Sequence, residues 1–168
     1  MAVLDIRVVP DPILRRKTRR VRDIDASIQR LLDDMLETMH YAGGVGLAAN
    51  QVGVLHRVAV IQRPEDQEPL FLVNPEVVRR EGQREVEEGC LSIPGYQGTL
   101  FRSVTVRVKA LDRNGKPFRI KAEELLAQAL EHEIDHLNGI LYIDHLKSHE
   151  KLHKIETEQD PVEAGAAS

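Results

Sequence analysis

Two histidines and a glutamate in the last third of the chain have the spacing of a metal-binding motif. His132 and His136 are four residues apart and Glu133 directly follows the first histidine, which gives the pattern HExxH. On a helix, residues four apart lie on one face, where two imidazoles can hold a metal ion and the glutamate can reach a water molecule bound to it. Structural core histidines are the alternative, but two imidazoles and a carboxylate buried together would need partners.

Catalytic metal sites commonly use three protein ligands and a water molecule, so HExxH is one ligand short. Cys90 is the only cysteine of the chain and lies in the stretch Glu-Glu-Gly-Cys-Leu-Ser at residues 87–92. A buried structural thiol is the usual interpretation of a lone cysteine. The missing ligand makes Cys90 a candidate for the third position, and a thiolate favours Fe(II) or Zn(II) over magnesium or calcium.

The elements that must position these groups follow from the periodicity of the apolar residues. Helical spacing extends over residues 123–138, with Asn138-Gly139 as a stop signal, and over residues 25–43, where Asp25 is a suitable N-terminal cap. Residues rich in β-branched and aliphatic side chains predict strands over 54–61, 70–78, 104–109 and 118–122, the last two joined by a hairpin turn at Asn114-Gly115.

Short antiparallel strands followed by one long helix, without alternating β-α units, predict an α+β domain. We expect antiparallel β-sheets wrapped around a central HExxH-bearing helix, with an N-terminal helix and a C-terminal helix. The C-terminal helix would carry His145, His149 and His153, whose alternation with lysines favours a solvated face over a second metal site. A single catalytic domain is expected over residues 1–158 and a disordered tail over residues 159–168.

Composition excludes several function classes. The net charge of −4 over 168 residues and the absence of tryptophan give no electrostatic or stacking case for a nucleic-acid-binding body. The first eleven residues have no apolar run long enough for a signal peptide or a membrane span, so we expect a cytoplasmic protein. The glycine-rich stretch at residues 44–51 lacks the Gly-Lys-Ser/Thr of a phosphate-binding loop and ends in Gln51, an uncharged amide donor.

Three of these stretches together resemble the bacterial-type peptide deformylase family. Residues 44–51 are similar to the family's first motif, residues 88–92 to its EGCLS motif and residues 132–136 to its HExxH, in the family's order and with similar separations. The resemblance covers roughly residues 1–150. It implies an α+β metalloenzyme that removes the formyl group from the N-terminal formyl-methionine of new proteins. Its metal would be Fe(II), sometimes replaced by zinc, nickel or cobalt, held by Cys90, His132 and His136.

The resemblance also implies roles for individual residues. Glu133 would act as general base and then as general acid while a metal-bound hydroxide attacks the formyl carbon. The Gln51 side chain and the Leu91 backbone N–H would stabilise the oxyanion. Substrate-binding positions are Val45, Gly46, Glu88, Gly89, Leu125 and Ala129. Of these, Leu125 and Ala129 share a helical stripe with His132 and His136 by spacing alone, so they are expected to wall a methionine pocket.

Two departures from the family pattern limit what is carried over. Some relatives have an arginine after the Cys motif, whereas residues 93–97 contain none and Arg102 is the nearest cation. Side-chain preference beyond methionine is therefore left open. A basic C-terminal helix can dock such enzymes on the ribosome, but here it would present only Lys147, Lys151 and Lys154.

Two other functions compete with this interpretation. A zinc peptidase also uses HExxH with a glutamate base, and its third ligand usually lies downstream, where Asp144, His145 and Glu150 are available. That interpretation leaves Cys90 unexplained. A non-catalytic metal-binding or ribosome-associated module is the second alternative, and it would have no need for Glu133.

Overall fold

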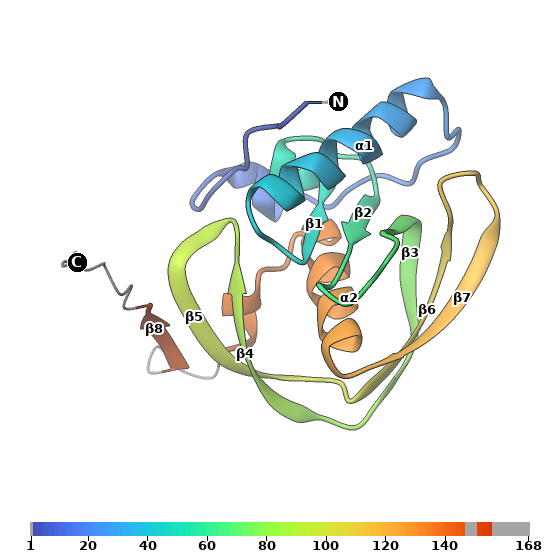
Figure 1. Cartoon of the computed structure of the whole chain (residues 1–168). Coiled ribbons are helices and arrows are strands. Elements are labelled where there is room, and N and C mark those ends of the chain that lie inside the picture. The colour runs from blue at the N-terminus through green and yellow to red at the C-terminus, as the bar shows by residue number, and fades with distance from the viewer. Residues whose placement is uncertain (1, 147–150, 156–168) are drawn as a thin grey trace.

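The computed structural model describes residues 2–146 and 151–155. Within these residues the chain forms two α-helices, three 3-10 helices and eight strands (Figure 1). In order they are η1 (Pro12–Arg15), α1 (Ala26–Tyr41), β1 (Gly46–Ala48), η2 (Ala49–Val52), β2 (Val58–Ile61), β3 (Leu70–Glu81), β4 (Arg84–Cys90), β5 (Ile93–Arg102), β6 (Thr105–Leu111), β7 (Pro117–Glu123), α2 (Glu124–Leu137), η3 (Tyr142–His145) and β8 (Leu152–Lys154).

All strand pairs are antiparallel and they form two sheets. One sheet has the order β1-β2-β3-β6-β7 and the other the order β4-β5-β8, so β1 and β4 are terminal strands. Figure 1 shows α2 between the two sheets and α1 across β1 and β2. The α+β fold with antiparallel sheets around the HExxH helix is thereby confirmed. No helix among the described residues is both long and apolar enough to cross a membrane.

The C-terminal half of helix α2 is buried on every side. Each residue from Leu130 to Leu137 is buried, including Glu131, Asp135 and both histidines of the motif. A helix buried all round needs partners for its polar side chains, and the partners come from the surrounding strands. The helix ends as expected: Gly139 has a φ of +78°, and a Cβ there would lie 2.5 Å from the Arg15 carbonyl oxygen.

Helix α1 forms where the sequence predicts it. The Asp25 side chain accepts hydrogen bonds from the backbone N–H groups of Ser27 and Ile28, which caps the first turn. Its apolar stripe packs into a core cluster with residues of β1 and β2, and comprises Ile28, Leu32, Met35 and Met39. The helix covers the sheet and contributes no residue to the cleft described below.

The β4–β5 hairpin was not predicted, although it carries Cys90. Its strands pair from Arg84↔Arg102 to Cys90↔Ile93. Burial alternates along β4, but one of the inward positions is the charged residue Glu88, and Arg102 is an inward position on β5. Charged residues at buried positions remove the apolar alternation by which a strand is recognised.

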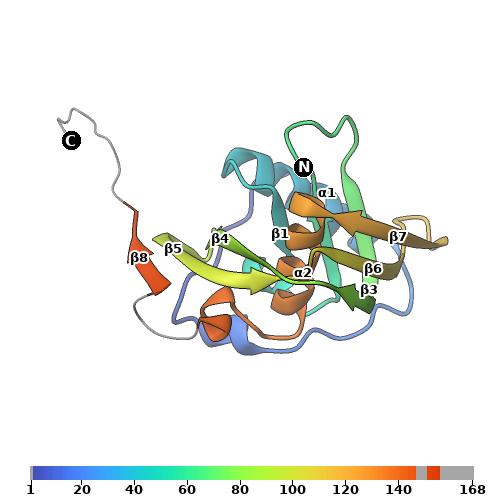
Figure 2. The ribbon, with the colours of Figure 1, turned by 90° about the horizontal axis from the view of Figure 1, so that it is seen from below.

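The expected C-terminal helix is wrong for the residues that the structure describes. His145 ends the 3-10 helix η3, and His153 lies in β8, where it is paired with Gln97 of β5. The histidines recur every four residues, but no apolar residues recur with the same spacing to bury one face of a helix. Leu152, the one apolar residue of β8, packs onto a core cluster, and its backbone extends the sheet at β5 (Figure 2). His149, Lys147, Glu150 and the tail at residues 159–168 lie outside the described residues. The single domain over residues 1–158 stays a prediction.

Candidate functional site

Three potential metal ligands converge at the end of β4 and on one face of α2. The ligand atoms of Cys90, His132 and His136 all lie within 4.8 Å of one another. Cys90 Sγ lies 3.1 Å from His136 Nε2, which lies 3.2 Å from His132 Nε2. Turn spacing on α2 aligns the two histidines, and the β4–β5 hairpin places the thiol opposite them. One thiolate and two imidazoles aimed at a common point fit a divalent metal ion with an open fourth position.

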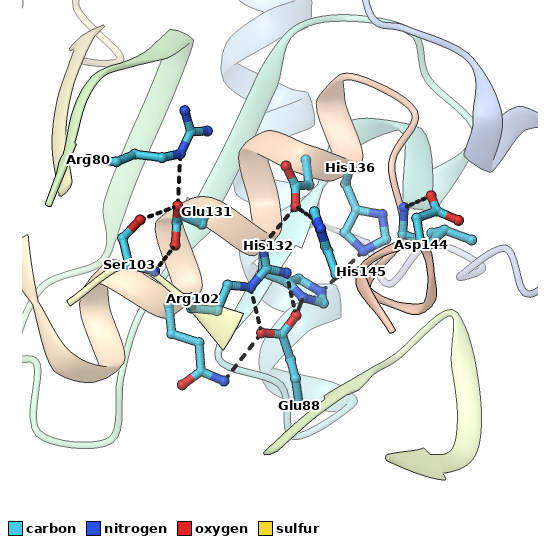
Figure 3. A network of polar contacts seen from close by, with 12 residues as sticks. Arg80, Glu88, Arg102, Ser103, Glu131, His132, His136, Asp144 and His145 are labelled. Atoms are coloured by element: carbon cyan, nitrogen blue, oxygen red, sulfur yellow. Dashed lines mark hydrogen bonds and ion pairs between the residues drawn. The ribbon is translucent and has the colours of Figure 1, made fainter. Parts of the chain in front are cut away.

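A buried carboxylate and a buried guanidinium fix the first of these histidines (Figure 3). The Glu88 carboxylate contacts His132 Nδ1 and accepts hydrogen bonds from Arg102 Nη2 at 2.6 Å and from Arg102 Nε at 3.0 Å. Burial alone would raise the pKa of Glu88, but the hydrogen bonds from His132 and Arg102 outweigh it and lower that pKa to about 2. An ionised Glu88 holds the proton on Nδ1, so Nε2 presents its lone pair to the metal position.

Arg102 links this pair to the next turn of α2. Its Nη1 donates to Asp135 Oδ2 at 2.7 Å, and His145 Nε2 lies 2.8 Å from the same oxygen. Arg102, the cation nearest to the Cys motif, is 5% exposed and pairs with two carboxylates. It is therefore not available to a substrate. His145 pairs with Asp135 and not with a metal cluster. A second polar group on α2, Glu131, is held by Arg80 and Ser103 (Figure 3).

Glu133 lies beside the three ligands and differs from Glu88 in its surroundings. Glu133 is 4% exposed, and its Oε1 has no hydrogen-bond partner among the described residues. Burial raises the pKa of Glu133 to about 7 against the opposing charge of His132. Gly46 of β1 makes room for this carboxyl group, because a Cβ at Gly46 would lie 2.9 Å from Glu133 Cδ. A carboxyl group that titrates near neutral pH can both accept and return a proton.

Gln51 is oriented by its own loop. Its Oε1 accepts from the Ala48 backbone N–H at 2.9 Å, which turns the Nε2 group toward Ser92 Oγ at 3.1 Å and Cys90 Sγ at 3.6 Å. The amide donor thus points to the metal ligands. Leu91 follows Cys90 in the turn between β4 and β5, and its side chain packs against Gly44, where a Cβ would come within 2.8 Å of Leu91 Cδ1.

A cleft of about 490 Å³ opens over these groups. It brings together every candidate site residue except His136, which is 1% exposed and does not line it. The candidates that line it are Val45, Gly46, Gln51, Glu88, Gly89, Cys90, Leu91, Leu125, Ala129, His132 and Glu133. Sequence reasoning missed the lining residues Tyr96 of β5 and Ile155 after β8, because neither carries a chemical motif and both depend on strand pairing.

The peptidase interpretation needs a third metal ligand downstream of HExxH. Of its candidates, the structure describes Asp144 and His145, and neither joins the metal cluster. Asp144 accepts hydrogen bonds from the Leu141 N–H and from Arg15 Nη1, and His145 contacts Asp135. Both side chains are thereby committed to structural contacts. Among the described residues, the one group of three that could hold a metal is Cys90, His132 and His136.

Comparisons with known proteins agree with this site. The family model described as polypeptide deformylase matches residues 3–152. Peptide deformylases from Dehalococcoides mccartyi and Halothermothrix orenii are 57% and 52% identical to this chain, over 92% and 86% of it and 93% and 94% of their own lengths. The crystal structure of a peptide deformylase from Legionella pneumophila is 48% identical, covers 89% of each chain and has a TM-score of 0.86.

A second solved structure has a similar fold. The peptide deformylase from Synechococcus elongatus, in complex with actinonin, is 38% identical, covers 98% of this chain and 89% of its own, and has a TM-score of 0.86. The family model matches most of the chain, and the two relatives named above are more than 50% identical to it. The chain therefore belongs to the peptide deformylase family, hydrolases that act on N-formyl-methionyl peptides.

Proposed function

We propose that this chain removes the formyl group from the N-terminal formyl-methionine of newly made proteins, with Glu133 as the group that moves the proton. The observation that carries the proposal is a buried carboxyl group with a pKa of about 7 beside three converging metal ligands. In the alternative of a structural metal site, nothing would require a buried, unpaired carboxyl group at this position.

Cys90, His132 and His136 would hold the metal, and we infer Fe(II), with zinc, nickel or cobalt able to replace it. A soft thiolate with two imidazoles suits these metals and not magnesium or calcium. When bound, the metal supplies a Lewis acid that lowers the pKa of a water molecule toward neutrality. Glu88 and Arg102 support this role because they keep His132 in the tautomer that ligates through Nε2.

The other groups of the cleft act on the substrate. Glu133 accepts a proton from the attacking water and delivers it to the amine that leaves when the formyl C–N bond breaks. Gln51 Nε2 and the Leu91 backbone N–H would donate to the formyl oxygen as it gains negative charge, and each such donor is worth about 3 kcal/mol. Val45, Leu125 and Ala129 give the cleft an apolar wall for the methionine side chain.

One comparison of activities tests the proposal. The protein, purified and assayed without oxygen, should release formate from a formyl-methionyl peptide and should not cleave internal bonds of an unformylated peptide of the same sequence. Oxygen is excluded because a thiolate ligand and Fe(II) are both subject to oxidation. Internal cleavage without formate release would support the zinc peptidase. The absence of both activities in metal-loaded protein would support the non-catalytic module.

A further inference from the structure

Positive charge is concentrated in one short segment of a chain whose net charge is −4. Six of the eight residues from 15 to 22 are basic, and we refer to this segment as the basic strap. All six are exposed, whereas the three apolar or hydroxyl residues that flank or interrupt them are buried. The exposed residues are Arg15, Arg16, Lys17, Arg19, Arg20 and Arg22; the buried ones are Leu14, Thr18 and Val21.

The strap is fixed to the core by its backbone and by its buried residues. The Thr18 N–H and Oγ1 both donate to the Leu137 carbonyl at the end of α2, at 2.8 and 2.9 Å. The Arg19 N–H donates to the Leu55 carbonyl at 2.9 Å, and Val21 exchanges two hydrogen bonds with the Asn74 side chain. The backbone that carries this row of cations is thus held in place by the core, which lowers the entropy lost on binding a partner.

The strap forms one wall of a hollow of about 700 Å³ whose other walls are β3 and the end of α2. In Figure 2 the blue segment that follows η1 passes below α2 and β3. Five basic side chains line the hollow, with Glu76 as the one acidic residue, and none of the lining residues is aromatic. The basic residues are Lys17, Arg19, Arg20, Arg57 and Arg80.

Most of this positive charge is not neutralised within the described part of the chain. Arg20 pairs with Glu76 at 3.5 Å and Arg80 with Glu131 at 2.9 Å. Lys17, Arg19 and Arg57 have no carboxylate within 4.0 Å among the described residues. Arg57 is 8% exposed, and its guanidinium donates only to neutral oxygens, those of Pro75, Leu137 and Asn138. A buried cation that has no carboxylate within 4.0 Å, at the wall of a basic hollow, favours an anionic ligand.

The chemistry of the surface selects among anionic ligands. Guanidinium groups match phosphate oxygens with two parallel hydrogen bonds, and the strap has five arginines to one lysine. The row from Arg16 to Arg22 can extend over about 20 Å, which is long for one small ion and suits a phosphate polymer. Without an aromatic residue in the hollow there is no stacking platform for unpaired bases. The apolar residues of the strap are buried, so none is free to insert into a lipid layer.

We propose that the basic strap and its hollow bind the phosphate backbone of a double-stranded nucleic acid, RNA or DNA, without reading its sequence. The negative net charge of the whole chain would argue against such binding if the charges were spread evenly over the surface. Here the basic residues are concentrated in the strap. The surface is distinct from the catalytic cleft, since the two share no lining residue.

Fluorescence anisotropy of labelled 20-base-pair RNA and DNA duplexes with the metal-loaded protein tests this. At low salt we expect a dissociation constant of about 10 µM, and affinity should fall with salt with a log–log slope of about −3. Lys17→Glu/Arg19→Glu should weaken binding at least tenfold while formate release stays unchanged. The matched control is Lys151→Glu/Lys154→Glu, the same charge change on exposed lysines beside and in β8, which should change affinity less than twofold.

Each outcome decides for or against the surface. Preference for the RNA or the DNA duplex identifies the source of the phosphates and supports the proposal in either case. Equal weakening by both double variants means that binding depends on total charge, which overturns it. Binding to vesicles with 30% phosphatidylglycerol but not to duplexes would also overturn the proposal. The absence of duplex binding at 20 mM salt would overturn it as well. Circular dichroism of each variant, read beside formate release, shows that loss of binding is not loss of fold.

Discussion

The same side-chain type serves two purposes in this site because its surroundings differ. Glu88 has two strong donors and a pKa of about 2, whereas Glu133 is buried without a partner for Oε1 and has a pKa of about 7. One carboxyl group stays ionised and holds the candidate metal ligand His132, and the other can exchange a proton. Environment, and not residue type, assigns these roles.

Replacing Glu133 by glutamine should remove turnover and leave metal binding intact. Glutamine keeps the size of the side chain but cannot accept the proton, and general acid-base catalysis is worth about a hundred- to ten thousandfold. Formate release and metal content are measured on the same preparation. Parallel loss of metal and activity would make Glu133 structural, and undiminished activity would remove it from the mechanism.

The pH profile of the unmodified protein provides a second measure of Glu133. Since burial raises its pKa to about 7, the carboxylate is lost as the pH falls through that value, and kcat/KM should fall with it. A bound cation lowers the pKa of a nearby acid, so the metal-loaded protein should show this acidic limb between about pH 5 and pH 7. A profile that is flat from pH 5 to pH 8 would contradict the assignment of Glu133 as the base.

Cys90→Ala should lose tightly bound metal, because it removes the thiolate and leaves two imidazoles. The matched control is His145→Ala, which removes a histidine that contacts Asp135 and lies outside the ligand cluster. Metal content by elemental analysis after anaerobic gel filtration distinguishes them. If Cys90→Ala keeps one equivalent and His145→Ala loses it, the third ligand lies downstream, as in the peptidase alternative.

At the scale of elements, the sequence predicted those whose apolar pattern is regular. Helix α1, helix α2 and the β6–β7 hairpin have uninterrupted periodicity and local stop signals such as Gly139. The β4–β5 hairpin has charged residues at buried positions, and Glu88 and Arg102 are compatible with burial only because each is beside the other. Such mutual dependence cannot be seen in either strand separately, so the sequence identified Arg102 only as the cation nearest to the Cys motif.

The C-terminal residues show the opposite error. The spacing of their histidines is regular, but it buries no apolar surface that would stabilise a helix. Histidines four apart at 145, 149 and 153 suggested a helix, but polar periodicity contributes no burial. Leu152 and the free edge of β5 decide the structure of residues 152–154 instead. The candidate metal ligands were predictable because HExxH and a lone cysteine are defined by residue type, whereas the cleft residues Tyr96 and Ile155 are defined by strand pairing.

The stripe on α2 above the metal ligands gives a prediction about substrate preference. Ala129 lines the cleft and is 8% exposed, with Leu125 one turn away. Ala129→Phe should fill the methionine pocket and reduce the preference for formyl-Met over formyl-Ala peptides, which in the unmodified protein should be about ten- to a hundredfold in kcat/KM.

Leu126→Phe is the matched control for this pocket. Leu126 packs on the core cluster and does not line the cleft, so the same aromatic residue is introduced elsewhere on the helix. Its preference ratio should stay as in the unmodified protein. An unchanged ratio in a folded, metal-loaded Ala129→Phe protein would place the pocket elsewhere.

At the scale of the whole molecule, the buried network of Glu88, Arg102 and Asp135 makes stability depend on pH. The folded-state pKa of Glu88 is lowered from 4.5 to about 2, so its contribution is present above pH 4.5 and is lost as the pH falls toward 2. Such a shift corresponds to about 3 kcal/mol. Glu88→Gln should therefore lose less free energy of unfolding between pH 5 and pH 3 than the unmodified protein.

Urea denaturation of the chelator-treated proteins measures this, since metal binding adds its own pH dependence. Asp66→Asn is the matched control: it removes an arginine–carboxylate pair with Arg63 near the surface, where solvent screens the attraction. Its pH dependence should stay closer to that of the unmodified protein than the pH dependence of Glu88→Gln does. Identical slopes for Glu88→Gln and the unmodified protein would mean that Glu88 titrates alike in the folded and unfolded states.

The two terminal strands β1 and β4 both contribute to the lining of the cleft. A terminal strand has a row of backbone N–H and C=O groups without a neighbouring strand, and an extended peptide lying along it is held by its own backbone. Backbone groups are the same in all amino acids except proline. A cleft bordered in this way can select the first side chain in its pocket and hold the backbone of the residues that follow whatever their side chains are, so it suits peptides of many different sequences.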